Sequence, residues 1–89
     1  MNFLEKRKCR KLLKDVDYQF AAMNLVERFN NGVIEKQLAE LFDSYLVDPC
    51  FETAIKIIDR SPGFLFFFSE CKPGGIYFIQ HEVRTMKRE

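Results

Sequence analysis

The apolar and polar positions of the chain divide it into helical stretches followed by a strongly apolar C-terminal stretch. Residues 3–14 and 18–29 carry apolar side chains near helical spacing and predict two helices. One continuous helix over 3–29, bent near Asp15, is the alternative, and helix propensity does not decide between them. Asp15 and Asp17 can each cap a second helix, because a short carboxylate accepts hydrogen bonds from the free N–H groups of a first turn. The predicted apolar stripe of the first helix consists of Phe3, Leu4, Cys9, Leu12 and Leu13.

The clearest helical period lies in the middle of the chain. It follows Asn30-Asn31-Gly32, which predicts a helix end because Asn and Gly tolerate the left-handed conformation. Apolar residues then recur at helical spacing with charged residues opposite them, which predicts a third helix. A fourth helix is predicted to begin at Asp48-Pro49, with Asp48 as its N-cap, and to end before Ser61-Pro62-Gly63. The predicted stripe of the third helix is Ile34, Leu38, Leu41, Phe42 and Tyr45, and that of the fourth is Phe51, Ala54, Ile55 and Ile58.

Residues 64–83 predict a β-hairpin, since two apolar stretches flank a Lys72-Pro73-Gly74-Gly75 turn. Phe64, Phe66 and Phe68 would share one face of the first strand. A hairpin alone is marginally stable in water, so the upstream helices must cover one of its faces. The predicted fold class is α+β, with three or four helices followed by a C-terminal two-stranded β-hairpin.

Length and composition narrow the class of protein. The 89 residues, 47% of them hydrophobic, fit one compact domain, with leading helices over 1–32, a helix pair over 33–60 and the hairpin over 64–83. No apolar run approaches the roughly 20 residues of a membrane helix, and the N-terminus lacks the apolar segment of a signal peptide. Three cysteines without close spacing argue against a disulfide framework. We therefore expect a cytoplasmic protein with no membrane partner.

The order of the predicted elements resembles that of winged helix-turn-helix domains, in which a helix pair precedes a hairpin. The resemblance covers residues 33–83 and is one of pattern. Gln37 to Phe42 resembles the first helix of the pair, and Phe51 to Arg60 takes the place of the recognition helix. Gly63-Phe64-Leu65 resembles the start of the wing, and Gly75 to Ile79 its return strand. The resemblance implies DNA binding, although many winged helices bind proteins instead.

Charge is concentrated at the N-terminus, where six basic residues in positions 1–14 face a single acid, Glu5. Such a cluster is suited to phosphate, because affinity for nucleic acid depends largely on neutralising phosphates. The alternative is a solvated face that keeps a Phe-rich protein soluble. The fourth helix offers a nearly neutral outer side, so the first helix would supply most of the charge. The predicted nucleic-acid-binding residues are Lys6, Arg7, Arg10, Lys11, Lys14, Thr53, Lys56, Arg60 and Lys72.

No arrangement typical of a catalytic or metal site stands out. Cys9, Cys50, Cys71 and His81 lack the close ligand pairs of structural zinc sites. A Cys71–His81 nucleophile has no evident third group to orient it. Glu70-x-Lys72 with Asp59 has the residue types of some metal-dependent nucleases, but Asp59 is predicted on a helix. We expect a protein that is not an enzyme and has no cofactor, no metal and no small-molecule substrate.

The density of phenylalanine in the C-terminal stretch exceeds what one sheet face needs. Burial of both faces explains it, and so does a protein interface or a homodimer through the hairpin. The first expectation is thus a small nucleic-acid-binding regulator. The alternative is a protein-binding module, such as an adaptor, an immunity-type partner or an inhibitor made by a phage or other mobile element. The predicted interface residues are Phe64, Phe66, Phe67, Phe68, Tyr77 and Ile79.

Overall fold

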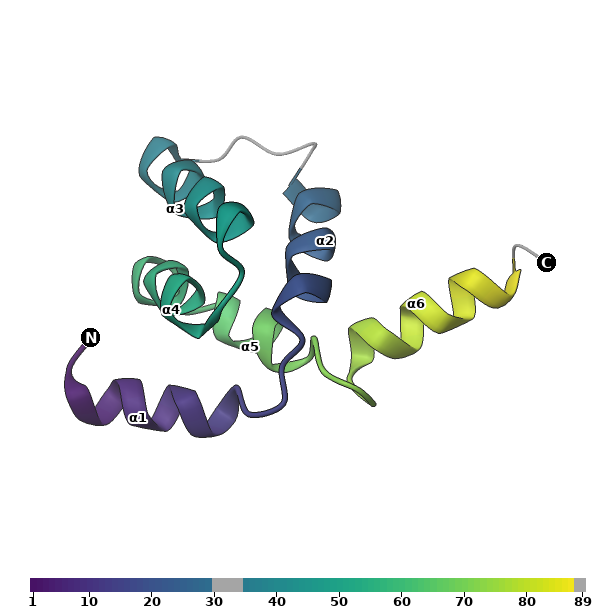
Figure 1. The fold of residues 1–89 in the computed structure, drawn as a ribbon, viewed down its shortest axis with the longest axis horizontal. Helices are drawn as coiled ribbons and strands as arrows, with labels where there is room; N and C mark the ends of the chain where they lie inside the picture. Colours follow the sequence, from purple (N-terminus) through teal and green to yellow (C-terminus); the bar gives the residue numbers. More distant parts are fainter. Residues whose placement is uncertain (30–34, 88–89) are drawn as a thin grey trace.

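The protein is helical throughout the part of the chain that the computed structural model describes, residues 1–29 and 35–87 (Figure 1). No β-strand occurs in these two ranges, so the predicted α+β class and the winged-helix assignment are wrong. The helices are α1 (Phe3–Leu12), α2 (Tyr18–Phe29), α3 (Lys36–Val47), α4 (Phe51–Arg60), α5 (Phe64–Ser69) and α6 (Ile76–Lys87).

The predicted hairpin is a pair of helices, α5 and α6. A short run that is apolar at nearly every position carries no periodicity, so it suits a buried helix as well as a strand. As a helix it places Phe64, Phe67 and Phe68 on one face, where Phe67 and Phe68 are buried. Phe66 lies on the opposite side and is 72% exposed. The Lys72–Gly75 segment turns the chain between two helices instead of two strands.

Residues 3–29 form two helices, which decides between the two alternatives. The chain turns at Asp15, whose φ of 67° lies in the left-handed region that a continuous helix excludes. Asp17 caps α2, since its Oδ1 accepts a hydrogen bond from the backbone N–H of Phe20 at 2.9 Å. The predicted helix end at residues 30–32 lies outside the described residues.

The helix α4 begins later than predicted. Its N-cap is Cys50, not Asp48, and Pro49 precedes the helix. The hydroxyl of Thr53 accepts a hydrogen bond from the Cys50 backbone N–H at 3.3 Å and donates one to the Asp48 carbonyl at 2.6 Å. Thr53 therefore closes the start of the helix in the manner of a capping box.

The core is organised around α4, which packs against α1, α3 and α5 (Figure 1). Half of its residues are buried, so this helix presents apolar side chains over a wide arc. α3 adds Phe42 and Tyr45, and α2 adds Leu25. The buried residues of α4 are Phe51, Ala54, Ile55, Ile57 and Ile58.

Two hydrogen bonds tie distant parts of the chain together. The phenol of Tyr45, which is fully buried, donates to the carbonyl of Tyr18 at 2.5 Å and so fixes α3 to the start of α2. Burial of this phenol raises its pKa well above the ordinary value. The backbone N–H of Asp17 donates to the carbonyl of Cys71 at 2.8 Å. The α1–α2 connection is thereby held against the segment that follows α5.

The helix α6 projects from the rest of the molecule, on the side opposite to the start of α1 (Figure 1). Its inner side is anchored by Phe78, which stacks on Phe20 with 3.8 Å between ring centroids, and by Tyr77, whose ring meets Phe67 edge to face. The radius of gyration is 13.4 Å, against about 12 Å for a compact chain of this length. The projecting helix accounts for that difference.

Candidate nucleic-acid interface

The helix α1 lies on the surface of the core and is rich in basic residues. Asn2 starts it, since the Asn2 Oδ1 accepts a hydrogen bond from the Glu5 backbone N–H at 2.8 Å. Only Cys9 within the helix is buried, together with Leu13 just after its end. Phe3, Leu4 and Leu12, predicted in the buried stripe, are instead 76%, 67% and 55% exposed.

Arg10 fixes α1 to α4. Its guanidinium lies over the ring of Phe51, 4.1 Å from the ring centroid, and donates a hydrogen bond to Glu52 Oε1 at 2.9 Å. The same hydrogen bond lowers the pKa of the Glu52 carboxyl. Arg10 was predicted to meet phosphate, but the structure gives it a role in holding two helices together.

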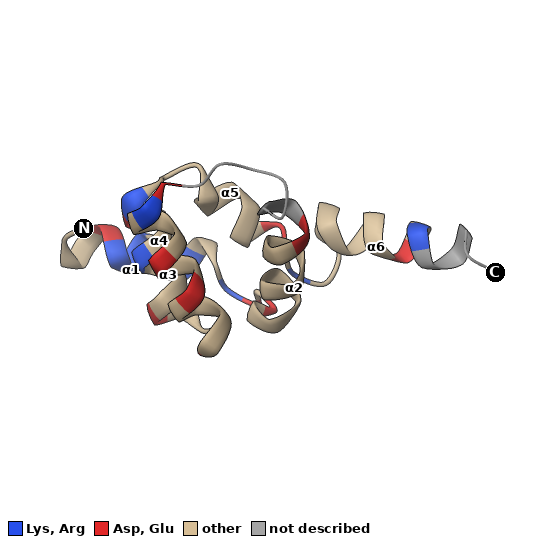
Figure 2. Cartoon of the chain, turned by 90° about the horizontal axis from the view of Figure 1, so that it is seen from above, with Lys and Arg blue, Asp and Glu red and all other residues tan. Residues whose placement is uncertain are grey.

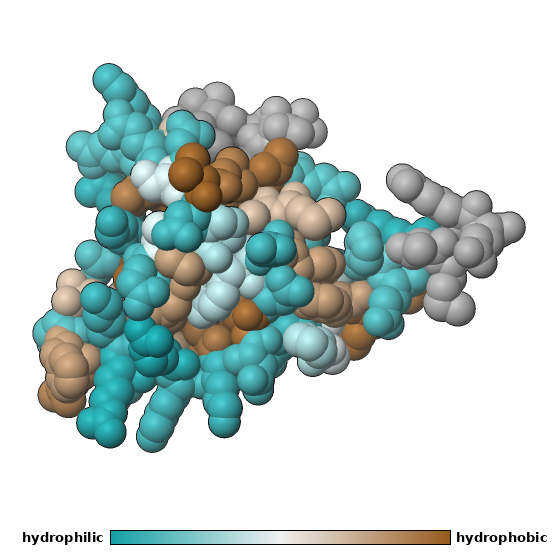
Figure 3. Space-filling model, viewed as in Figure 1, coloured by the Kyte–Doolittle hydropathy of each residue, from teal (hydrophilic) through white to brown (hydrophobic). Residues whose placement is uncertain are grey.

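The other cations of this region are exposed and available. None of them forms an ion pair within the described residues, although the charge of Lys6 helps, after the Arg10 hydrogen bond, to lower the pKa of the Glu52 carboxyl. In Figure 2 the basic positions gather toward the end of the molecule formed by α1 and α4. In Figure 3 hydrophilic side chains project along the lower edge, where α1 lies in Figure 1. The available cations are Lys6, Arg7, Lys8, Lys11 and Lys14.

The residues predicted to extend this surface over α4 do not join it as a basic face. Thr53 is occupied in capping α4, and Arg60 is paired with Glu35 at the start of α3. Lys56 is exposed on α4, and Lys72 is half-buried in the segment before α6. The predicted set is therefore divided, and among the side chains that the structure describes the unpaired positive charge is concentrated on and just after α1.

Phe3 is the residue of this surface that sequence reasoning missed. It was assigned to the buried stripe, yet it borders a surface hollow of about 410 Å³ on α1, together with Lys6, Arg7 and Arg10. These four positions follow i, i+3, i+4 and i+7, the spacing of one helix face. That spacing was present in the sequence and is the signal that would have found it.

The predicted protein-interface residues are divided between core and surface. Phe67 and Phe68 are core residues, and Phe64 and Tyr77 are half-buried. Phe66 and Ile79 are exposed, at 72% and 51%. Most of the phenylalanine density thus serves the core.

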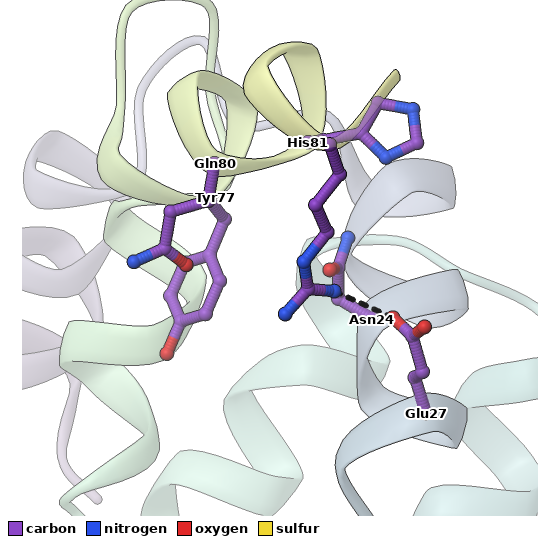
Figure 4. Close-up of a pocket in the computed structure, with 6 residues that line it drawn as sticks. Asn24, Glu27, Tyr77, Gln80 and His81 are labelled. Carbon is purple, nitrogen blue, oxygen red and sulfur yellow. Dashed lines mark ion pairs between the residues drawn. The ribbon is translucent and has the colours of Figure 1, made fainter. Parts of the chain in front are cut away.

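A second hollow, of about 470 Å³, lies between α2 and α6 (Figure 4). Its lining is polar, and the Arg84 guanidinium in it reaches the Glu27 carboxylate at 3.8 Å, both side chains being 71% exposed. Figure 4 shows the His81 ring turned away from this pair. Exposed charges that already pair in water make a weak site for a ligand. The lining residues are Asn24, Glu27, Tyr77, Gln80, His81 and Arg84.

All three cysteines are free thiols, and they lie in different elements of the fold from His81 on α6. Cys71 is fully buried and donates to the Phe67 carbonyl, whereas His81 lies edge-on to Phe20. Cys9 is buried on the inner side of α1, and Cys50 is half-buried at the start of α4. Within residues 1–29 and 35–87, no cluster of three or more His, Cys, Asp or Glu side chains is arranged to hold a metal ion.

Comparison of the chain with models of known protein families, with curated proteins and with solved structures finds no match. In the described part of the chain, no helix has the length and apolar character needed to span a bilayer. The inference of function therefore depends on the geometry of α1 and on the apolar surfaces of the molecule.

Proposed function

We propose that this protein is a small, non-enzymatic nucleic-acid-binding protein that holds the phosphate backbone with α1. The observation that carries the proposal is the set of five exposed cations on and just after one helix, none paired with an acid in the described residues. With Arg10 committed to Glu52, the charge left over faces solvent. We place the protein in the cytoplasm, where three free thiols stay reduced.

The shape of this surface suits contacts with the phosphate backbone of a nucleic acid that do not depend on base sequence. α1 lies flat along the core, attached by Cys9, Leu13 and Arg10, so its outer side is available along its whole length. Lysine and arginine on such a face meet phosphates regardless of sequence. The proposal therefore predicts binding that depends strongly on salt and little on base sequence.

The test is a binding titration against random-sequence oligonucleotides at two salt concentrations. If four cations engage phosphates, affinity should fall roughly 100-fold between about 50 and about 200 mM salt, because each neutralised phosphate releases counterions. Lys11→Glu should weaken binding about tenfold at low salt by removing one phosphate contact and repelling another.

Lys36→Glu is the matched control, since it makes the same charge change on an exposed residue at the start of α3. It should change affinity less than about twofold, as expected for a charge outside the contact surface. An equal loss in both variants would refute a site on α1 and indicate a response to net charge alone.

A second candidate function, self-association, is favoured by the outer side of α6. Ile76, Ile79 and Val83 recur at i, i+3 and i+7 and are 51%, 51% and 44% exposed. The neighbouring charges Glu82 and Arg84 have opposite signs, so two copies of this face would not repel each other. The exposed apolar residues of α1 lie among cations, so two copies of α1 would repel each other and α1 is less suited to self-association. The occupant we propose for α6 is therefore a second copy of this chain.

Ile79→Glu should raise the dimer dissociation constant at least about tenfold, because each copy would bring a charge into an apolar contact. Sedimentation equilibrium measures it. Val47→Glu, at a position 87% exposed at the end of α3, is the matched control and should leave the mass in solution unchanged. A wild-type protein that stays monomeric at high concentration would rule out this interface.

A further inference from the structure

The hollow on α1 combines an aromatic ring with fixed positive charge. Phe3 stands at one end of it, 76% exposed, and Lys6 and Arg7 follow one helical turn later. Arg10 closes the other end, held in place by Phe51 and Glu52. An exposed ring beside cations is suited to a ligand that offers both a flat apolar group and an anion.

The charges of the hollow are not equivalent. The Glu52 carboxylate lies 2.9 Å from the Arg10 guanidinium and disfavours an anion at that end. Lys6 and Arg7 lie nearer to Phe3 along the helix and form no ion pair within the described chain, and Glu52 feels Lys6 less than it feels Arg10, whose hydrogen bond is the main cause of its lowered pKa. An anion is therefore best held at Lys6 and Arg7, beside the ring and not beyond Arg10.

The dimensions suit a short length of polynucleotide. Phe3 and Arg10 are seven residues apart, which is about 10 Å along a helix. A stacked strand rises about 3.4 Å per nucleotide, so the hollow spans two or three nucleotides. The bases of a duplex are stacked on their neighbours and cannot stack on the face of the Phe3 ring, whereas an unpaired base can.

We propose that α1 binds single-stranded nucleic acid in preference to duplex, with an unpaired base stacked on Phe3 and the adjoining phosphates held by Lys6 and Arg7. This inference rests on the proposed function and adds the class of ligand to it. Stacking on an aromatic side chain gives affinity without base preference, because every base has a π-face. The remaining cations, Lys8, Lys11 and Lys14, add charge that any nucleic acid would experience.

The experiment compares a fluorescent single strand of about 12 nucleotides, within the usual range of single-strand site sizes, with the duplex of the same sequence. Wild-type protein should bind the single strand several-fold more tightly. Phe3→Ala should weaken single-strand binding roughly tenfold, the usual cost of losing one stacked base, and duplex binding less than about twofold. Phe3→Trp should retain the preference, since a larger ring still stacks.

Phe66→Ala is the matched control, because it removes a phenylalanine of similar exposure, 72%, from α5. It should leave both affinities unchanged. Both rings are exposed, so circular dichroism should show the same helix content in both variants.

Two sets of results would overturn the inference. Equal affinity for single strand and duplex, or an equal effect of Phe3→Ala on both, removes the stacking role and leaves phosphate binding by α1 in place. Failure to bind either oligonucleotide at low salt defeats the proposed function as well. A phosphatidylserine vesicle is the probe for that last case, and Phe3-dependent binding to it without oligonucleotide binding would identify an anionic membrane as the ligand.

Discussion

Replacing Phe68 with alanine is expected to lower the free energy of unfolding by about 3 to 5 kcal/mol, the range for truncating a buried aromatic residue. Its ring is fully buried and meets Tyr45 and Phe67 edge to face, with centroids 5.3 and 5.2 Å away. Small domains are stable by about 5 to 15 kcal/mol in total, so this variant should be close to unfolding at room temperature. Urea denaturation followed by circular dichroism measures the change.

Phe66→Ala is the control, and it also tests the helical state of α5. In a strand Phe66 and Phe68 would share a face, whereas in the helix Phe66 is 72% exposed and Phe68 fully buried. The control should cost less than about 0.5 kcal/mol, as for most surface substitutions. Similar costs for the two variants would contradict the helix and support the hairpin.

Gly75→Ala is expected to destabilise the connection between α5 and α6 by about 2 kcal/mol or more, the cost of forcing atoms into packed space. A Cβ at this position would collide with the Glu70 carbonyl oxygen and lie 2.8 Å from its carbon and 2.9 Å from the Lys72 oxygen. These are backbone atoms, so relief requires the whole turn to shift. Hydrogen exchange should show the α6 amides losing protection before those of the core.

Gly63→Ala supplies the comparison for this variant. Nothing lies within 4 Å of a Cβ there, and the backbone φ of −59° suits alanine. Its effect should be neutral or stabilising by up to about 1 kcal/mol, because alanine restricts the unfolded chain. If Gly75→Ala behaves as Gly63→Ala does, the tight turn before α6 is not formed.

The helices α3 and α4 were predictable because local signals mark them, whereas the sequence allowed α1 and α2 to be either two helices or one helix bent near Asp15. Helical spacing of apolar residues identified α3 and α4, and Asp17 was recognised as a possible cap for α2. The start of α4 was misplaced because Cys50 is a rare N-cap, and its partner Thr53 was assigned to a binding surface. Spacing and capping residues thus indicated where the helices lie, but not every residue at which a helix begins.

The C-terminal third was not predictable because its signals are ambiguous. Phe64, Phe66 and Phe68 fit a strand, while Phe64, Phe67 and Phe68 fit a helix, and tertiary packing against Tyr45 favours the second arrangement. The segment around Gly74, whose φ is 84°, has turn chemistry that serves hairpins and helix pairs alike.

The positive charge of the candidate site could be predicted from the sequence, but the arrangement of its side chains could not. Composition alone identified α1 as basic, because six cations fall within 14 positions. Arg10 contacts Phe51 and Glu52 because α1 lies along α4. Arg10 and Glu52 are 42 positions apart in the sequence, so local patterns do not reveal this contact. The exposure of Phe3 follows from the same packing, which buries Cys9 and Leu13 instead.

The three cysteines lie at different depths in the protein, so the reactivity of each thiol reports on a different degree of unfolding. A thiol reagent can reach the half-buried Cys50 in the folded state. It reaches Cys9 when α1 lifts from the core, and Cys71, fully buried, when the core itself opens. The rates of modification at these positions would therefore separate local fluctuation from global unfolding without any added label. Oxidative coupling between folded copies would be confined to Cys50.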